Sequence, residues 1–149
     1  MVEGIFHVGV TVTNLERSIQ FYEQMLGMEL SISPGPTPPM SGEEFSNKIG
    51  VPGSELRLAV LKAGSDELEL MEFLAPHPAS TEPMMRNVIG AAHVAFKVSG
   101  LDAQVEAMKK KGVQFLGDVH TETEGSTAGW RWVFFRDPDG IIVELSGKD

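Results

Sequence analysis

The sequence predicts an α+β fold made of two tandem βαβββ modules that form a curved mixed β-sheet cleft, with helices packed on the outside. Three observations predict it: a strand–helix pattern near the start, the return of this pattern near residue 93, and a glutamate in the last strand of each copy. We expect a single domain over residues 1–149, with module one over about 4–75, a linker over about 76–89 and module two over about 90–147.

The first module begins with a strand and a helix. Apolar residues alternate with polar or small ones at four positions, Phe6, Val8, Val10 and Val12. A period of two predicts a strand with one face on a core. A helix should follow from the N-cap Asn14 to the stop at Gly27, because apolar residues recur between them at helical spacing. Residues 28–33 are expected to form a second strand.

The rest of the first module combines a loop, a short helix and a hairpin. Residues 34–53 hold five prolines, which indicates either a functional loop or a slack connection. Ser41 and Glu44 have the spacing of a capping box and predict a helix over 43–49. Strands over 55–62 and 67–74 should follow, and in the second of them Glu69 alternates with apolar neighbours.

The second module repeats this order. Val94, Phe96 and Val98 alternate with polar or small residues and predict a strand. A helix is expected over 102–111, with Val105 and Met108 facing inward and a glycine at 112 as its stop. A strand near 113–116, a polar loop over 118–129, and a hairpin of residues 130–136 and 141–146 complete the module.

Both copies place a histidine and a glutamate at equivalent positions. Each histidine precedes a leucine by eight residues, His7 before Leu15 and His93 before Leu101. Glu69 and Glu144 lie in the last strand of their copies. If the apolar strand faces pack on the helices, two imidazoles and two carboxylates point into the concave face.

Such a donor set suits a divalent cation. Isolated glutamates in a cleft are costly to desolvate, and a cation would offset their charge. Imidazole and carboxylate select Zn, Ni, Co, Mn or Fe(II). Four protein ligands on an octahedral ion would leave two positions for water or a substrate oxygen, which is a catalytic rather than a closed structural arrangement.

Composition excludes several classes of partner. Lys and Arg number 12 and Asp and Glu number 21, a net charge of −9 that argues against nucleic acid and anionic membrane surfaces. The absence of cysteine excludes disulfides and thiolate metal sites. No apolar run approaches the ~20 residues of a membrane span and no signal-peptide pattern is present. We therefore expect a cytoplasmic protein that binds a small-molecule substrate.

The chain resembles the vicinal oxygen chelate superfamily over nearly its whole length. The motifs are His7-Val8-Gly9-Val10, Leu15-Glu16-Arg17-Ser18, Phe21-Tyr22, Leu26-Gly27, Gly90-Ala91-Ala92-His93-Val94-Ala95-Phe96, and Phe135-Arg136-Asp137-Pro138-Asp139-Gly140 through Glu144-Leu145. This superfamily includes glyoxalase I, methylmalonyl-CoA epimerase, extradiol dioxygenases, and fosfomycin and bleomycin resistance proteins. The motifs are most like those of glyoxalase I-like and methylmalonyl-CoA epimerase-like members.

The resemblance implies that the metal ligands are His7, Glu69, His93 and Glu144, a set similar to that of bacterial glyoxalase I. Two positions depart from that enzyme. Thr11 stands where it has an arginine for the glutamyl carboxylate of glutathione, and Phe73 stands where it has an asparagine. Without the charged clamp the anion loses its charge-assisted hydrogen bonds, so glutathione is not the expected substrate. Met71 and Phe73 would form a more apolar pocket wall or simply pack in the core.

The activity implied by the resemblance is that of a metal-dependent lyase or isomerase. It would act on a small carbonyl or vicinal-oxygen substrate by metal-stabilised enolisation. Glu144 in the first place, and Glu69 in the second, would move the proton. Trp130 and Trp132 could line the cleft or pack outside it, because strand parity alone does not decide.

Two other functions stay open. An extradiol dioxygenase would bind Fe(II) through His7, His93 and Glu144. Glu69 would crowd the oxygen position of such a site, and the chain is shorter than the larger dioxygenases. A non-catalytic module that binds a small molecule is the other alternative. The resemblance also implies a homodimer, in which each site is built within one chain or across two swapped chains.

Overall fold

A computed structural model gives the fold and describes residues 1–33, 39–78, 80 and 82–148. The chain divides into two compact units, Met1–Thr81 and Glu82–Asp149, which are described separately. The division falls within the linker predicted over 76–89. Residues 34–38 of the proline-rich stretch lie outside the described residues.

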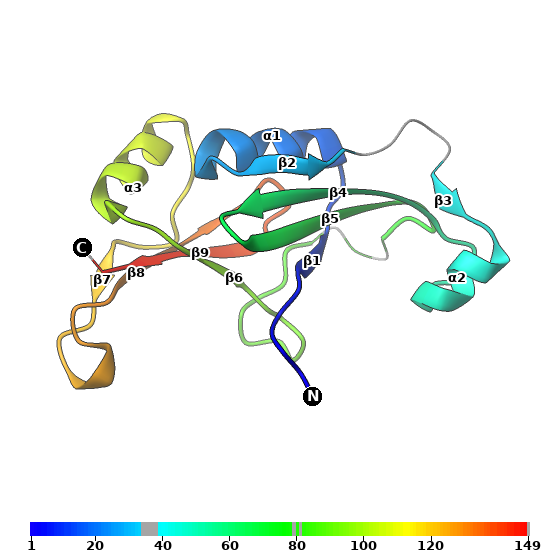
Figure 1. Cartoon of the computed structure of the whole chain (residues 1–149). Coiled ribbons are helices and arrows are strands. Elements are labelled where there is room, and N and C mark those ends of the chain that lie inside the picture. Colours follow the sequence, from blue (N-terminus) through cyan, green and yellow to red (C-terminus); the bar gives the residue numbers. More distant parts are fainter. Residues whose placement is uncertain (34–38, 79, 81, 149) are drawn as a thin grey trace. The chain divides into compact units, whose positions relative to one another are not determined.

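The first unit holds a five-stranded mixed sheet (Figure 1). The main path of this sheet is β1-β5-β4-β2, and the short β3 pairs with β4. Its strands are β1 (Val8–Thr11), β2 (Glu29–Ile32), β3 (Met40–Ser41), β4 (Glu55–Ala63) and β5 (Asp66–Ala75). β1 runs parallel to β5, whereas β2, β3 and β5 run antiparallel to β4. This is the predicted βαβββ order, with β3 and α2 (Glu43–Ile49) inserted before the hairpin.

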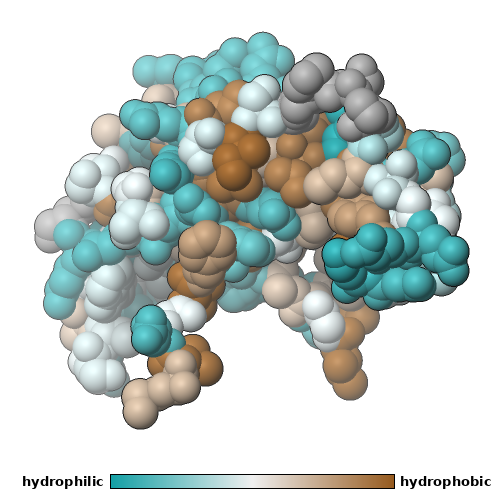
Figure 2. Space-filling model, turned by 45° about the vertical axis from the view of Figure 1, so that its right-hand side comes forward, coloured by the Kyte–Doolittle hydropathy of each residue, from teal (hydrophilic) through white to brown (hydrophobic). Residues whose placement is uncertain are grey.

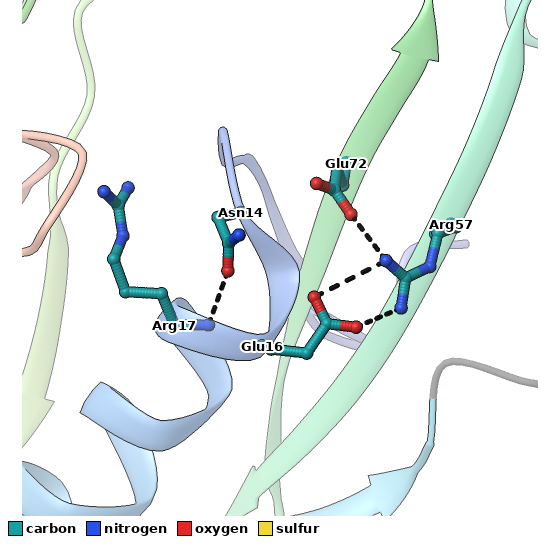
Figure 3. Close-up of polar contacts among 5 residues, drawn as sticks. All are labelled: Asn14, Glu16, Arg17, Arg57 and Glu72. Atoms are coloured by element: carbon teal, nitrogen blue, oxygen red, sulfur yellow. Dashed lines mark hydrogen bonds and ion pairs between the residues drawn. The ribbon is translucent and has the colours of Figure 1, made fainter.

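Helix α1 (Leu15–Leu26) packs against β4 and β5. The Asn14 side chain accepts a hydrogen bond from the Arg17 backbone N–H at 2.8 Å (Figure 3). Gly27 ends the helix with φ 66°. Both predicted caps are therefore confirmed. Leu15 and Tyr22 are fully buried. Burial of a leucine side chain of this kind stabilises the fold by about 1.5–3 kcal/mol.

Two expectations for the first unit are wrong. The helix over Glu43–Ile49 forms, but its N-cap is Gly42 and has no side-chain cap hydrogen bond, because Ser41 is drawn into β3. The predicted apolar face of the first strand is also only partly covered. Phe6 is 80% and Val8 37% exposed, because β1 lies at the edge of the sheet while α1 packs on β4 and β5.

The second unit holds a four-stranded mixed sheet in the order β6-β9-β8-β7. Its elements are β6 (Val94–Lys97), α3 (Leu101–Lys110), β7 (His120–Thr121), a 3-10 helix (Gly125–Thr127), β8 (Arg131–Arg136) and β9 (Ile142–Gly147). β6 runs parallel to β9, and β8 runs antiparallel to both of its neighbours. Leu101, Val105 and Met108 of α3 are buried, as the helical spacing predicts.

Two details of the second unit differ from the sequence prediction. The expected strand near 113–116 is reduced to a single bridge between Phe115 and Phe135. The expected loop over 118–129 contains β7 and the 3-10 helix. His120 comes five positions after Phe115 in the sequence. Their partners in β8, Trp132 for His120 and Phe135 for Phe115, are only three positions apart. The two additional residues interrupt the ladder, so the pairing with β8 resumes only at β7.

Several apolar side chains remain exposed outside the two sheets. They lie near the N-terminus and in the segment before β6: Met1, Val2, Ile5, Phe6, Met84, Met85, Val88 and Ile89. Figure 2 shows brown apolar surface among the teal polar surface. Exposed apolar residues of this kind are typical of contact regions. In the described part of the chain no helix has the length and apolar character needed to cross a membrane.

Candidate metal and substrate site

The first unit brings His7 and Glu69 together on the sheet face opposite α1. The parallel register of β1 and β5 pairs Gly9 with Glu69. Because alternate residues share a face, His7 and Thr11 lie on the side that carries Glu69. The distance from His7 Nε2 to Glu69 Oε1 is 3.9 Å, and the side chains are 39% and 20% exposed. The pair is therefore accessible to a ligand.

A glycine leaves room for this carboxylate. A Cβ at Gly9 would lie 3.1 Å from Met71 Cε and 3.6 Å from Glu69 Oε1. Thr11 pairs with Met71 across the same two strands, and Phe73 follows two residues later on the same face. The three pocket residues predicted in the first unit thus share the sheet face of Glu69.

The second unit repeats this arrangement with His93 and Glu144. The parallel register of β6 and β9 pairs Ala95 with Glu144, which places His93 on the side that carries the carboxylate. His93 Nε2 lies 3.1 Å from Glu144 Oε2, and the side chains are 40% and 16% exposed. In both units the glutamate pairs with the residue two positions after the histidine. The duplication seen in the sequence is therefore also a duplication of strand register.

Each unit by itself supplies two candidate ligands. Within the described residues, no group of three or more histidine, aspartate or glutamate side chains is gathered that could hold a metal ion. The union of the two pairs in one four-ligand site is accordingly a proposal and is argued below.

A row of aromatic rings extends from His93 across the second sheet. Ring centroids are 5.4 Å apart for His93 and Phe134, 5.2 Å for Phe134 and Trp132, and 4.8 Å for Trp132 and His120. Phe134 pairs with Glu144 in the β8–β9 ladder, and Trp132 lies two residues before Phe134. Both rings therefore lie on the face of Glu144, which decides for Trp132 what strand parity left open.

The far end of this row is held by Glu122. Its Oε1 accepts a hydrogen bond from Trp132 Nε1 at 2.9 Å and lies 3.6 Å from His120 Nε2. Trp130, the other predicted pocket tryptophan, precedes β8. Its backbone N–H donates to the Thr127 carbonyl at 2.8 Å, and its carbonyl accepts from the Glu122 N–H at 2.7 Å. The backbone of Trp130 is thus held by Thr127 and Glu122, and the place of its ring in the pocket stays a prediction.

Two residues of this surface, Phe134 and Arg86, escaped the sequence prediction. Phe134 lies two residues after Trp132, so strand alternation places both side chains on one face. A prediction that Trp132 lines the site could therefore have included Phe134. Arg86 lies in the predicted linker, and its guanidinium carbon lies 3.7 Å from the centroid of the Phe134 ring. No sequence pattern signals this contact, because it joins a loop to a strand through the tertiary fold.

Shifted pKa values occur where the first turns of α1 and α3 meet arginines of the sheets. Arg57 donates to Glu16, which lowers the pKa of Glu16 and raises the pKa of Arg57, and it also donates to Glu72 at 3.1 Å (Figure 3). In the second unit Arg131 donates to Asp102 at 2.6 and 2.9 Å and lowers the pKa of that carboxyl. These ion pairs join helices to sheets and have a structural role.

A sequence model of the Glyoxalase/Bleomycin resistance protein/Dioxygenase superfamily matches residues 4–145. The chain belongs to this superfamily. The resemblance read from its motifs is thereby confirmed. Among curated relatives in the superfamily, the 2-epi-5-epi-valiolone epimerase of an Actinomyces species is 33% identical over 145 residues, with coverage of 95% of this chain and 78% of that protein.

Solved glyoxalase-superfamily structures confirm the α+β fold. A glyoxalase family protein from Bacillus cereus has a TM-score of 0.80 at 23% identity, covering 99% of this chain and 95% of that chain. A FosX fosfomycin resistance protein from Listeria monocytogenes has a TM-score of 0.68 at 19% identity, covering 100% and 95%. That FosX is a mutant complexed with Mn(II) and 1S,2S-dihydroxypropylphosphonic acid. The proteins similar to this chain therefore include one named as an epimerase and one whose structure was solved with Mn(II).

Proposed function

We propose that this chain is a divalent-metal-dependent isomerase or lyase of the glyoxalase type, acting on a small carbonyl or vicinal-oxygen substrate. The observation that carries the proposal is the presence of two His–Glu pairs at equivalent register positions of the two sheets. Both pairs keep the imidazole about two-fifths exposed and the carboxylate more deeply placed. A single pair could be accidental, but a pair repeated in sequence, register and exposure indicates one shared site.

The donor set fits a divalent cation. We propose that His7, Glu69, His93 and Glu144 hold it together, with one pair from each unit. Two neutral imidazoles and two carboxylates suit Ni, Co, Zn, Mn or Fe(II), and their negative charge would be offset. When bound, such an ion supplies Lewis-acid chemistry that stabilises negative charge on a substrate oxygen.

The chain's own groups would move the proton. Glu144 is the proposed base that removes a proton from the carbon next to the substrate carbonyl, with Glu69 as the second carboxylate able to carry it. Glu144 lies beside His93 and in register with Phe134, so its surroundings are less polar than open solvent. Phe134 and Trp132 would exclude water from the reacting carbon. The name of the 33% identical relative, an epimerase, favours the isomerase form of this proposal.

Metal binding by untagged protein tests the proposal directly. After chelator treatment, wild type should bind one divalent ion per chain in calorimetric titrations with Ni, Co, Zn and Mn. His7→Gln and His93→Gln should each weaken binding by about 100-fold or more, since loss of even a residue that only hydrogen-bonds to a metal ligand costs about 10–100-fold. His77→Gln, which alters an exposed histidine outside both pairs, is the matched control and should bind as wild type does. Wild-type protein that binds none of the four ions would overturn the proposal.

The reaction is then tested by solvent exchange. Metal-loaded protein in deuterated buffer is mixed with 2-epi-5-epi-valiolone, methylmalonyl-CoA, or the hemithioacetal of methylglyoxal and glutathione. Proton NMR should show metal-dependent loss of a C–H signal next to a carbonyl in one of the first two compounds. Oxygen uptake by the Fe(II)-loaded protein with a catechol would instead contradict the isomerase assignment.

A further inference from the structure

The second unit carries a cation that neither the proposed ligand set nor the helix–sheet ion pairs use. Arg86 lies before β6, and its guanidinium carbon is 3.7 Å from the centroid of Phe134. The Phe134 ring in turn meets His93 edge-on, with centroids 5.4 Å apart and planes at 87°. A single aromatic ring therefore separates this guanidinium from a proposed metal ligand.

The contacts of Arg86 differ from those of other arginines. Arg57 and Arg131 donate to carboxylates, and Arg136 donates to the Gly140 carbonyl at 2.6 Å. Among the described residues no carboxylate pairs with Arg86, and its recorded contact is the face of a phenyl ring. A guanidinium stacked by its face keeps its N–H donors free at the edge.

Phe134 gives this cation a fixed platform. The ring is only 9% exposed, so it does not move freely under the guanidinium. A planar fork held in one orientation loses less conformational freedom when an oxyanion binds to it. Carboxylates and phosphates both accept two parallel N–H···O bonds from such a fork.

The negative net charge of the chain makes an exposed cation near the proposed site a sign of an anionic ligand. With a net charge of −9, the protein repels anions in general, so an anionic substrate needs a dedicated positive group. In the first unit, the face of Glu69 carries Thr11, Met71 and Phe73, none of which has a charge. Arg86 is positive and lies one ring from His93.

We propose that Arg86 is a specificity-determining residue that binds an oxyanion of the substrate, either a carboxylate or a phosphate. An oxyanion bound to Arg86 would place the reacting carbon of the substrate beside His93 and Glu144, and this part of the inference rests on the proposed function. The binding of an oxyanion by Arg86 does not. The proposed substrate class is therefore an anionic carbonyl compound. In the exchange experiment, reaction of the neutral 2-epi-5-epi-valiolone alone would contradict this inference while leaving the proposed function standing.

Anion binding is tested on the full chain by tryptophan fluorescence, because the Trp132 ring lies 5.2 Å from Phe134. The probes are malonate, phosphoglycolate and the neutral malonamide. Arg86→Gln should weaken binding of malonate, phosphoglycolate or both by about tenfold or more, because the charge-assisted hydrogen bonds of the guanidinium are lost. Arg86→Lys should give an intermediate loss because it keeps the charge without the fork, and malonamide binding should not change.

The matched control is Lys110→Gln, which removes the same charge from the exposed end of α3 in the same unit. It should change anion binding by no more than about twofold. If malonate alone depends on Arg86, the oxyanion is a carboxylate, and if phosphoglycolate alone does, it is a phosphate. The proposal is overturned if neither anion binds wild type, if Arg86→Gln has no effect, or if Lys110→Gln weakens anion binding as much as Arg86→Gln does.

The same titrations on chelator-treated protein separate the two proposals. Without metal, the anions have only the protein's own groups to bind, so a dependence on Arg86 there supports the oxyanion site even if the chain binds no metal. A chain that binds metal but shows no dependence on Arg86 leaves the proposed function standing and overturns this inference. Metal affinity of Arg86→Gln should equal that of wild type.

Discussion

Glu69 and Glu144 occupy the same position of the repeat, but their surroundings differ. Glu69 lies over Gly9 beside Met71, and its nearer oxygen is 3.9 Å from His7. Glu144 lies 3.1 Å from His93, in register with Phe134. Two carboxylates in different surroundings can have different roles in one site, such as metal binding and proton transfer. The aromatic wall beside Glu144 is the reason to give it the proton transfer.

Replacement of Glu144 tests this assignment. Glu144→Gln keeps the size of the side chain but removes the base, so exchange of the substrate C–H should fall by about 10²–10⁴-fold. Glu69→Gln serves as the matched comparison. It should lower the affinity for the metal ion by a larger factor than it lowers the rate of C–H exchange. Exchange at the wild-type rate in metal-loaded Glu144→Gln would show that another group takes the proton.

At the scale of elements, the repeat includes an ion pair that the sequence analysis did not identify. Glu16 is the second residue of α1 and binds Arg57 of β4, whereas Asp102 is the second residue of α3 and binds Arg131 of β8. In each unit an acidic residue in the first helical turn, where it also suits the helix dipole, is joined to the sheet. This pairing fixes the helix over the strands that carry the His–Glu pair.

The pH dependence of stability should reveal the Glu16 pair. The pKa of Glu16 is lowered in the folded state by its hydrogen bond from Arg57. Its contribution is therefore fully present above the ordinary glutamate pKa and is lost as the pH falls through the lowered value. Glu16→Gln should reduce the free energy of unfolding at pH 7 by about 0.5–1 kcal/mol, as surface ion pairs do.

Urea titrations of wild type and variant at pH 7 and at pH 3 would measure this difference. Between these values it should shrink as Glu16 becomes protonated in wild type. Glu23→Gln changes a glutamate on the same helix that forms no ion pair with the described residues. It is the control and should differ little from wild type at both values. An undiminished difference at low pH would mean that Glu16 contributes by packing rather than by charge.

For the whole molecule, the question is how two units, each with one His–Glu pair, combine. We propose a homodimer on the basis of the superfamily resemblance and of the exposed apolar side chains near the N-terminus and before β6. In one arrangement each chain completes its own site. In the other, unit one of a chain joins unit two of its partner.

Mixing two inactive variants distinguishes these arrangements. His7→Gln and His93→Gln chains are unfolded together in urea and refolded as a mixture. If the site joins two chains, each mixed dimer contains one site with both histidines intact, so about half of the dimers regain one high-affinity metal site. If each chain builds its own site, no high-affinity binding returns. Calorimetric titration of the mixture, with separately refolded variants as controls, measures the outcome.

Local sequence patterns alone predict the modules, the helix caps Asn14 and Gly27, and the equivalence of the two His–Glu pairs. Periodicity and capping are local properties, and a duplication is visible without any knowledge of packing. The sequence did not determine where pairing with β8 begins, because two additional residues before His120 shift that ladder. The prediction that Ser41 caps α2 is also wrong, because Ser41 belongs to β3 and pairs with Glu55 of β4.

The face that Trp132 occupies and the neighbours of His93 depend on how the strands pair in the folded chain. Strand parity sorts side chains into two sets, but the register against Glu144 is needed to say which set faces the site. Arg86 is the clearest case, because its contact with Phe134 joins residues far apart in the chain. Contacts of this kind depend on the path that a loop follows over the folded sheet. No local sequence pattern specifies that path.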